Sequence, residues 1–210
     1  VIYHSSLIQA MQEDLSADIQ MMSGASPDER ALSPPLFAVR KRLPWLQINL
    51  LTAFLAAAVV GLFESTIAKY TALAVLLPVV AGQSGNSGAQ ALAVTMRGLV
   101  LREITPRQWL GVTLKEAGVG LVNGIAVAVT CGIGVYLWSR SSGLVLVIMI
   151  SMVLAMVIAG LAGAIVPIVL KRLGQDPAQS SSIILTTVTD VAGFFSFLGI
   201  ATLLSGMLDA

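Results

Sequence analysis

The sequence is poor in charge and in the side chains on which most soluble enzymes rely. Only 11% of its residues are charged, whereas soluble domains carry roughly 25%. It contains one histidine, His4, and one cysteine, Cys131, so an intrachain disulfide and a thiolate metal cluster are both excluded. Hydrophobic residues make up 56% of the chain. This balance indicates an integral membrane protein.

Long apolar runs in the sequence predict transmembrane helices. A helix needs about 20 apolar residues to span the hydrocarbon core, and five runs of the sequence are long enough. They cover roughly 45–67, 71–99, 112–138, 144–170 and 181–208. We therefore predict an all-α integral membrane domain at 45–210 with five transmembrane helices per chain.

Residues 1–44 are polar and are predicted to be a cytosolic helix followed by a linker. Apolar residues recur there at spacings of three and four, which is typical of an amphipathic helix: Ile8, Met11, Leu15, Ile19 and Met22. Under the five-span threading, ten of the 12 Lys and Arg residues lie on the N-terminal side of the membrane, and only Lys69 and Arg140 lie on the other. Cytoplasmic loops carry such an excess. The N-terminus is thus expected in the cytoplasm and the C-terminus outside the plasma (inner) membrane.

The second run contains an uncharged polar segment, GQSGNSGAQ, at 82–90. Pro78 removes one helix hydrogen-bond donor, and each glycine weakens a helix by about 1 kcal/mol relative to alanine. Exposed backbone at membrane depth is tolerated only where protein buries it or a wet cavity solvates it. We expect this helix to be interrupted here and to line a pore; close packing of small residues is the alternative. The candidate pore-lining residues of the segment are Gly82, Gln83, Ser84, Ser87 and Gln90.

The fifth run carries one deeply placed carboxylate, Asp190. An ionisable residue at such depth costs at least ~2.5 kcal/mol and is a functional hypothesis by default. Thr186 and Thr187 precede it by four and three residues and extend a polar stripe on the same face, and Gly193 leaves room beside it. A protonated, structural Asp190 that bonds a neighbouring helix is the alternative.

Two further carboxylates are weaker candidates. Glu116 opens the third run next to Lys115, so an interfacial ion pair competes with a role in an ion path. Glu64 lies at the outer end of the first run, where pairing with Lys69 or simple hydration would suffice.

The sequence lacks the second catalytic group that each enzymatic interpretation requires. GQSG at 82–85 fits the motif of intramembrane serine proteases, but Ser84 would need an activating base, and His4 lies outside every span. An intramembrane aspartyl protease needs two carboxylates that share a proton, yet Asp190 is the only deep aspartate. The chain is therefore not expected to be an enzyme.

The remaining polar groups near Asp190 are oxygen ligands: carboxylate, amide, hydroxyl and backbone carbonyl. Without a nearby His or Cys they favour a hard cation over zinc or copper. Mg²⁺ usually keeps several waters and binds one or two carboxylates, so one Asp per chain doubled by a two-fold axis would suit it. K⁺, Na⁺ and a protonated amine stay open on composition.

These residues also resemble a known family, the MgtE-type magnesium channels and transporters. The similarity is carried by TALAVLLPVVAGQSGNSGAQ at 71–90, LKEAGVGL at 114–121, KRLGQDPA at 171–178 and TDVAGFF at 189–195. One position departs, because Ala89 stands where many members carry an asparagine.

The resemblance implies a homodimer in the lipid bilayer, with the ion path between subunits along the second and fifth helices. It implies that Asp190, Asn86, Gly85, Gly88 and Glu116 contribute to Mg²⁺ binding. Members of the family commonly carry a cytosolic N-domain and paired CBS domains. The stretch at 1–23 resembles the helix that joins those domains to the membrane part, so the sequence is expected to lack them and to be ungated or weakly gated.

We therefore predict a channel that carries Mg²⁺ into the cytoplasm down its electrochemical gradient, with no nucleic-acid partner. A transporter that couples cation movement to Na⁺ or H⁺, with Asp190 as the titrating group, is the second hypothesis. A structural membrane scaffold is the third.

Overall fold

The computed structural model describes residues 20–21, 25–175 and 177–208, so nearly all of the amphipathic helix predicted at 1–23 lies outside the described part. The elements in the described part are helical, as predicted. They are α2 (Pro35–Leu62), α3 (Glu64–Lys69), α4 (Ala72–Val100), the 3₁₀ turn η1 (Pro106–Gln108), α5 (Trp109–Ser139), α6 (Ser142–Arg172), α7 (Pro177–Leu203) and α8 (Ser205–Leu208).

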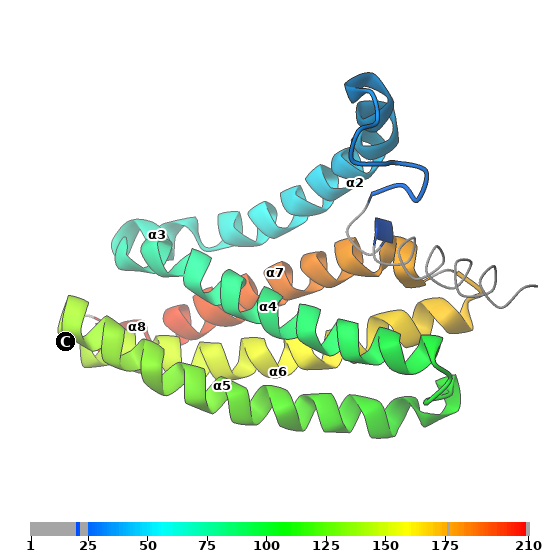
Figure 1. The fold of residues 1–210 in the computed structure, drawn as a ribbon. Coiled ribbons are helices and arrows are strands. Elements are labelled where there is room, and N and C mark those ends of the chain that lie inside the picture. The colour runs from blue at the N-terminus through cyan, green and yellow to red at the C-terminus, as the bar shows by residue number, and fades with distance from the viewer. Residues whose placement is uncertain (1–19, 22–24, 176, 209–210) are drawn as a thin grey trace, which may run out of the picture.

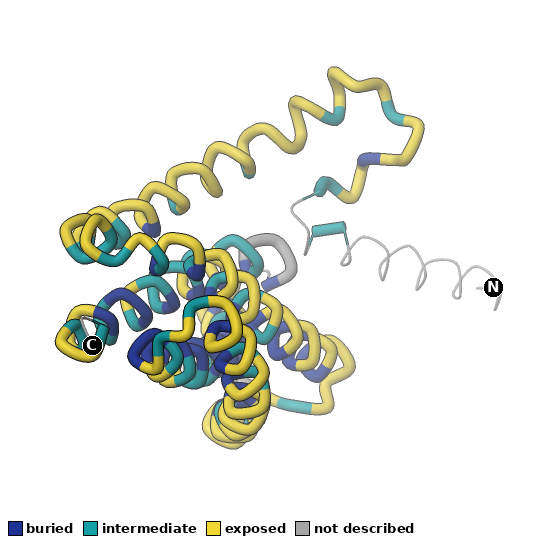
Figure 2. Tube along the Cα trace, turned by 90° about the vertical axis from the view of Figure 1, so that its left-hand side faces the viewer, coloured by how far each residue is buried: buried dark blue, intermediate teal, exposed yellow. Residues whose placement is uncertain are grey.

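Four long helices form a bundle, and a fifth stands apart from it. Helices α4, α5, α6 and α7 lie side by side, and α6 contacts each of the other three (Figure 1). Helix α2 contacts α7 but diverges from the bundle toward its N-terminal end (Figure 1). The burial pattern follows this arrangement, since α2 is almost wholly exposed while blue, buried segments gather in the bundle (Figure 2).

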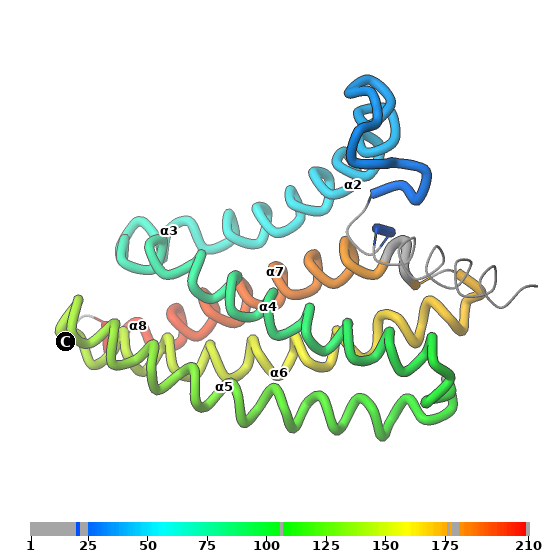
Figure 3. Tube along the Cα trace, viewed as in Figure 1, coloured from blue at the N-terminus to red at the C-terminus, as the bar shows by residue number. Residues whose placement is uncertain are grey.

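The long helices run nearly the full length of the bundle, and different short segments mark its two ends. Helices α3 and α8 lie at one end, and the loop at 101–108 lies at the other, as the tube in Figure 3 shows. The polar segment of α4 and the stripe of α7 lie between these ends.

Within the described residues, four helices are long and apolar enough to cross a membrane: α2, α5, α6 and residues 181–203 of α7. Helix α4 has 29 residues, which corresponds to about 43 Å at a rise of 1.5 Å per residue. Its length suffices for a span, but its polar segment lowers the hydropathy of the whole helix. Four of the five expected spans are therefore recovered from length and composition.

The predicted interruption of the second transmembrane helix is wrong, because α4 is α-helical from Ala72 to Val100 and includes both Pro78 and the glycines. Tertiary contacts offset the weak helix propensity. A Cβ on Gly163 of α6 would lie 2.5 Å from the carbonyl oxygen of Gly88, and a Cβ on Gly88 would lie 3.1 Å from Leu185 and from Thr189. Two backbones thus approach closely here, as in small-residue interfaces.

The first candidate membrane-spanning helix begins earlier than expected. Helix α2 starts at Pro35, with a proline in its first turn, and ends at Leu62. Phe63 then leaves helical geometry at φ −111° and ψ 18°, and α3 follows as a separate short helix. The predicted division between residues 44 and 45 consequently falls inside α2.

Candidate ion-binding site

Helix α7 presents a polar stripe that continues from Ser182 through Thr186 to Asp190, at spacings of four residues. The buried face of the same helix lies one residue earlier in each turn and includes Ser181, Leu185 and Thr189. The stripe therefore borders the packed face of α7 without belonging to it.

Asp190 is half-buried and makes no hydrogen bond or ion pair with another residue of the described part. Its chain neighbour Thr189 contacts the Gly88 position of α4, so the carboxylate lies at the depth of the polar segment of α4. The threonines before it bond their own helix: Thr186 Oγ1 donates to the Ser182 carbonyl (2.8 Å) and Thr187 Oγ1 donates to the Ile183 carbonyl (2.7 Å). Each hydroxyl oxygen keeps a lone pair for another partner.

The side of α4 that faces α6 and α7 is closely packed. Ser84 is fully buried, and its hydroxyl donates to the Val80 carbonyl at 2.9 Å. It also lies 3.4 Å from the position of a Cβ on Gly193. Ser84, Gly88 and Gly193 thus lie within the contact between α4 and α7, and the Gly88 carbonyl oxygen lies next to Gly163 of α6.

The other side of α4 is open. A Cβ on Gly82 or Gly85 would meet nothing within 4 Å. Asn86 and Gln90 are exposed, and Ser87 is partly buried. Gln83 lines a groove of about 450 Å³ together with Thr130 and Cys131 of α5, so it lies on the side of α4 next to α5.

Glu116 is buried on α5, where the helix packs against α6. A Cβ on Gly160 would lie 2.6 Å from the backbone carbonyl oxygen of Glu116. The Glu116 side chain is 5% exposed and accepts a hydrogen bond from Lys115 Nζ at 2.5 Å. The ion pair offered as one interpretation of Glu116 is therefore present. Glu64 is exposed in the first turn of α3, where the positive end of the helix dipole favours a carboxylate.

No group of three or more His, Cys, Asp or Glu side chains gathers within the described part of the chain. A cation at Asp190 would have one carboxylate from this chain, with hydroxyl, amide, carbonyl or water oxygens around it. That donor set suits a hard, strongly hydrated divalent cation.

Sequence reasoning missed Asn49 of α2, which lies across a cavity from Ser182 and Thr186. The available signal was an amide inside the apolar run LQINLLTAF.

Comparison with known families gives a match that includes the polar residues of both α4 and α7. The family model named MgtE and described as a divalent cation transporter matches residues 77–200, which include the polar segment of α4 and the stripe of α7. The chain belongs to the MgtE family. The suspected resemblance is thereby confirmed, and the family is one of transporters and not of enzymes.

Three MgtE relatives match almost the whole chain. The magnesium transporter MgtE of Thermus thermophilus is 32% identical over 206 residues, covering 97% of this chain and 46% of that protein. Proteins of the same name from Enterococcus faecalis and Bacillus subtilis are 30% and 28% identical, and the chain spans 45% of each. The chain thus spans less than half the length of these relatives.

Proposed function

We propose that this chain is the membrane part of a channel that carries Mg²⁺ into the cytoplasm across the plasma membrane. The single observation that carries the proposal is Asp190, a half-buried carboxylate without a partner among the described residues, beside the neutral polar groups of α7. A buried charge is usually paired or coordinates a cation. The relatives are named magnesium transporters, which selects Mg²⁺ among the hard cations.

Helix α4 is the fifth span in this proposal, and two copies of the chain form a homodimer. The open side of α4, with Gly82, Gly85 and Asn86, then meets the partner and lines the path together with the stripe of α7. Two subunits supply two Asp190 carboxylates, which together balance the charge of one Mg²⁺. The N-terminus is cytoplasmic, and the C-terminus is outside.

The membrane potential provides the driving force. At about 100 mV, inside negative, the inward movement of two charges gains roughly 4.6 kcal/mol. The proposal therefore requires neither ATP nor a second ion.

Mg²⁺ uptake into proteoliposomes under an inside-negative potential tests the proposal. Asp190→Asn and Asp190→Ala should each lower uptake on the order of tenfold or more, because the anion that holds the cation in a poorly solvated region is gone. A matched control is Glu64→Gln, which removes an exposed carboxylate and should conduct normally. Uptake that survives both Asp190 substitutions in folded protein would assign the ion to another site. A pH dependence of uptake that disappears in Asp190→Asn would instead favour H⁺ coupling.

A further inference from the structure

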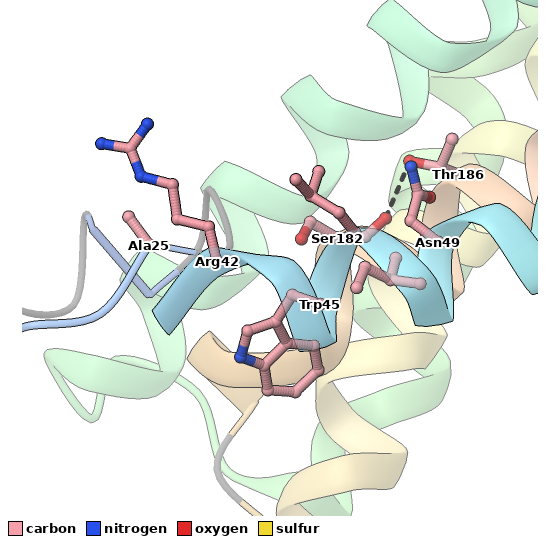
Figure 4. Close-up of a pocket in the computed structure, with 8 residues that line it drawn as sticks. Ala25, Arg42, Trp45, Asn49, Ser182 and Thr186 are labelled. Carbon is pink, nitrogen blue, oxygen red and sulfur yellow. Dashed lines mark hydrogen bonds between the residues drawn. The ribbon is translucent and has the colours of Figure 1, made fainter. Parts of the chain in front are cut away.

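A cavity of about 560 Å³ separates the N-terminal half of α2 from the start of α7 (Figure 4). Asn49 lines it from α2, and Ser182 and Thr186 line it from α7. Trp45 closes another part of the wall. The polar groups of both helices therefore face one space.

This cavity adjoins the proposed ion site. Thr186 is one helical turn from Asp190 on the same face, which is about 6 Å along the axis at 1.5 Å per residue. Ser182 is one turn further toward the start of α7 and hence toward the proposed cytoplasmic side. If the proposed function holds, a cation that leaves Asp190 for the cytoplasm next meets the hydroxyl of Thr186 and the amide of Asn49.

Arg42 is the one charged side chain among the described residues that line the cavity. Its guanidinium is turned away from Thr186 (Figure 4). Arg42 Nε donates to Glu29 Oε2 at 2.9 Å, and a second guanidinium nitrogen donates to Glu29 Oε1. Such a two-pronged pair fixes the direction of the guanidinium as well as its charge.

The partner carboxylate is held in place by its own loop. The Glu29 side chain is 6% exposed, whereas that of Arg42 is 56% exposed. The Glu29 backbone N–H donates to the Ser26 carbonyl at 3.0 Å, and its carbonyl accepts from Gln20 Nε2 at 3.1 Å. The position of Glu29 is thus fixed by burial and backbone hydrogen bonds, whereas the longer Arg42 side chain is exposed and can adopt other rotamers.

We propose that this cavity is the cytoplasmic vestibule of the cation path and that Glu29 keeps it open to cations by neutralising Arg42 and holding its guanidinium aside. This inference rests on the proposed function. Without Glu29, a flexible cationic side chain borders a space through which a divalent cation must pass. Repulsion between the two would slow passage by roughly three- to tenfold at low salt, and salt would screen it.

The test measures Mg²⁺ uptake by proteoliposomes that contain the full chain. Glu29→Gln should lower uptake severalfold at low ionic strength, and the deficit should shrink at about 1 M salt, where the Debye length is ~3 Å. The double variant Glu29→Gln/Arg42→Gln should return to the wild-type rate, because no uncompensated cation remains. Arg42→Gln alone should conduct at least as well as wild type.

The chain offers a matched control in the neighbouring ion pair. Lys41 Nζ lies 2.8 Å from Asp28 Oδ2, and both side chains are more exposed than that of Glu29. This pair also joins residues thirteen apart, but neither residue lines the cavity. Asp28→Asn should therefore leave uptake unchanged.

Wild-type uptake by Glu29→Gln, or a double variant no better than Glu29→Gln, would overturn the inference. If Glu29→Gln does not fold, the reversed pair Glu29→Arg/Arg42→Glu carries the test, and a rate well below wild type in folded protein would overturn the inference. Loss of uptake in Asp190→Asn together with normal uptake in Glu29→Gln rejects the vestibule alone. Equal uptake by wild type and Asp190→Asn rejects the proposed ion site itself.

Discussion

Ser84 and Asn86 lie two residues apart on α4 but in opposite surroundings. Ser84 is fully buried and its hydroxyl bonds the backbone of its own helix, whereas Asn86 is exposed. We expect Ser84→Ala to leave Mg²⁺ uptake unchanged and to lower stability by about 1 kcal/mol or less. Asn86→Ala should reduce uptake, because in the proposed function the Asn86 amide oxygen lines the ion path on the open side of the helix. Uptake and melting temperature of the two variants check this, and loss of uptake in a folded Ser84→Ala protein would place its hydroxyl on the path.

Single residues also show how far the candidate site was predictable. Asp190 stands out in an apolar run because charge at membrane depth is costly, so its identity needs no structure. The directions of Gln83 and Ser84 do need one. Helical periodicity fixes the directions of the side chains relative to one another around the helix axis. Packing against α6 and α7 decides which of these side chains is buried and which is exposed. Asn49 escaped notice because its partners on α7 are more than a hundred residues away in sequence.

We expect the ion pairs of Asp28 and Glu29 with the start of α2 to depend on pH. Hydrogen bonding and attraction from Lys41 lower the pKa of Asp28 below its ordinary 3.8, and hydrogen bonding from Arg42 lowers the pKa of Glu29 below its ordinary 4.5. Because both pKa values are lowered, the stabilisation of the loop is complete above the ordinary values and is lost as pH falls through the lowered ones. A spin label at Ala31→Cys, in a Cys131→Ser background, should therefore become more mobile only below about pH 4. The label should be mobile at every pH when Asp28→Asn and Glu29→Gln are added; equal mobility with and without these changes would contradict the prediction.

At the scale of helices, glycines set the distance between α4, α5 and α6. A Cβ on Gly163 would lie 2.5 Å from the Gly88 carbonyl oxygen, and one on Gly120 would lie 2.6 Å from the Met156 carbonyl oxygen. We expect Gly163→Val to destabilise the bundle by roughly 1–3 kcal/mol through overpacking. Gly118→Ala is the matched control, since a Cβ there meets nothing within 4 Å and alanine favours the helix by about 1 kcal/mol. Thermal unfolding in detergent separates the two, and equal melting temperatures would show that the close approach is absent in solution.

The same contacts explain why a local interpretation of α4 predicted a break. Proline and glycine each lower the local helix propensity. Helix propensity is a weak indicator of structure, because tertiary packing often outweighs it. The small residues that weaken α4 also let its backbone approach α6 and α7. The number and order of the long helices were predictable from apolar runs, whereas the continuity of α4 and the separation of α2 depend on contacts between distant segments.

For the whole molecule, the described residues of one chain leave large apolar surfaces exposed. Helix α2 diverges from the bundle (Figure 1), and along its length Leu46, Leu50 and Phe54 are exposed. The open side of α4 likewise carries polar groups that lipid tails cannot satisfy. A second copy related by a two-fold axis would cover the polar side of α4, while lipid would cover the remaining apolar surface.

Thiol cross-linking tests this assembly, because a residue close to a two-fold axis lies near its own counterpart. In a Cys131→Ser background, Asn86→Cys should form covalent dimers with a short bifunctional maleimide in native membranes. Val122→Cys is the control, since Val122 is 67% exposed on α5, a helix that the proposed interface does not include. Cross-linking at Val122 but not at Asn86 would move the dimer interface to α5 and separate the two Asp190 carboxylates. The cation would then have to pass through each subunit with a single carboxylate, which would leave one positive charge of Mg²⁺ unbalanced at the site.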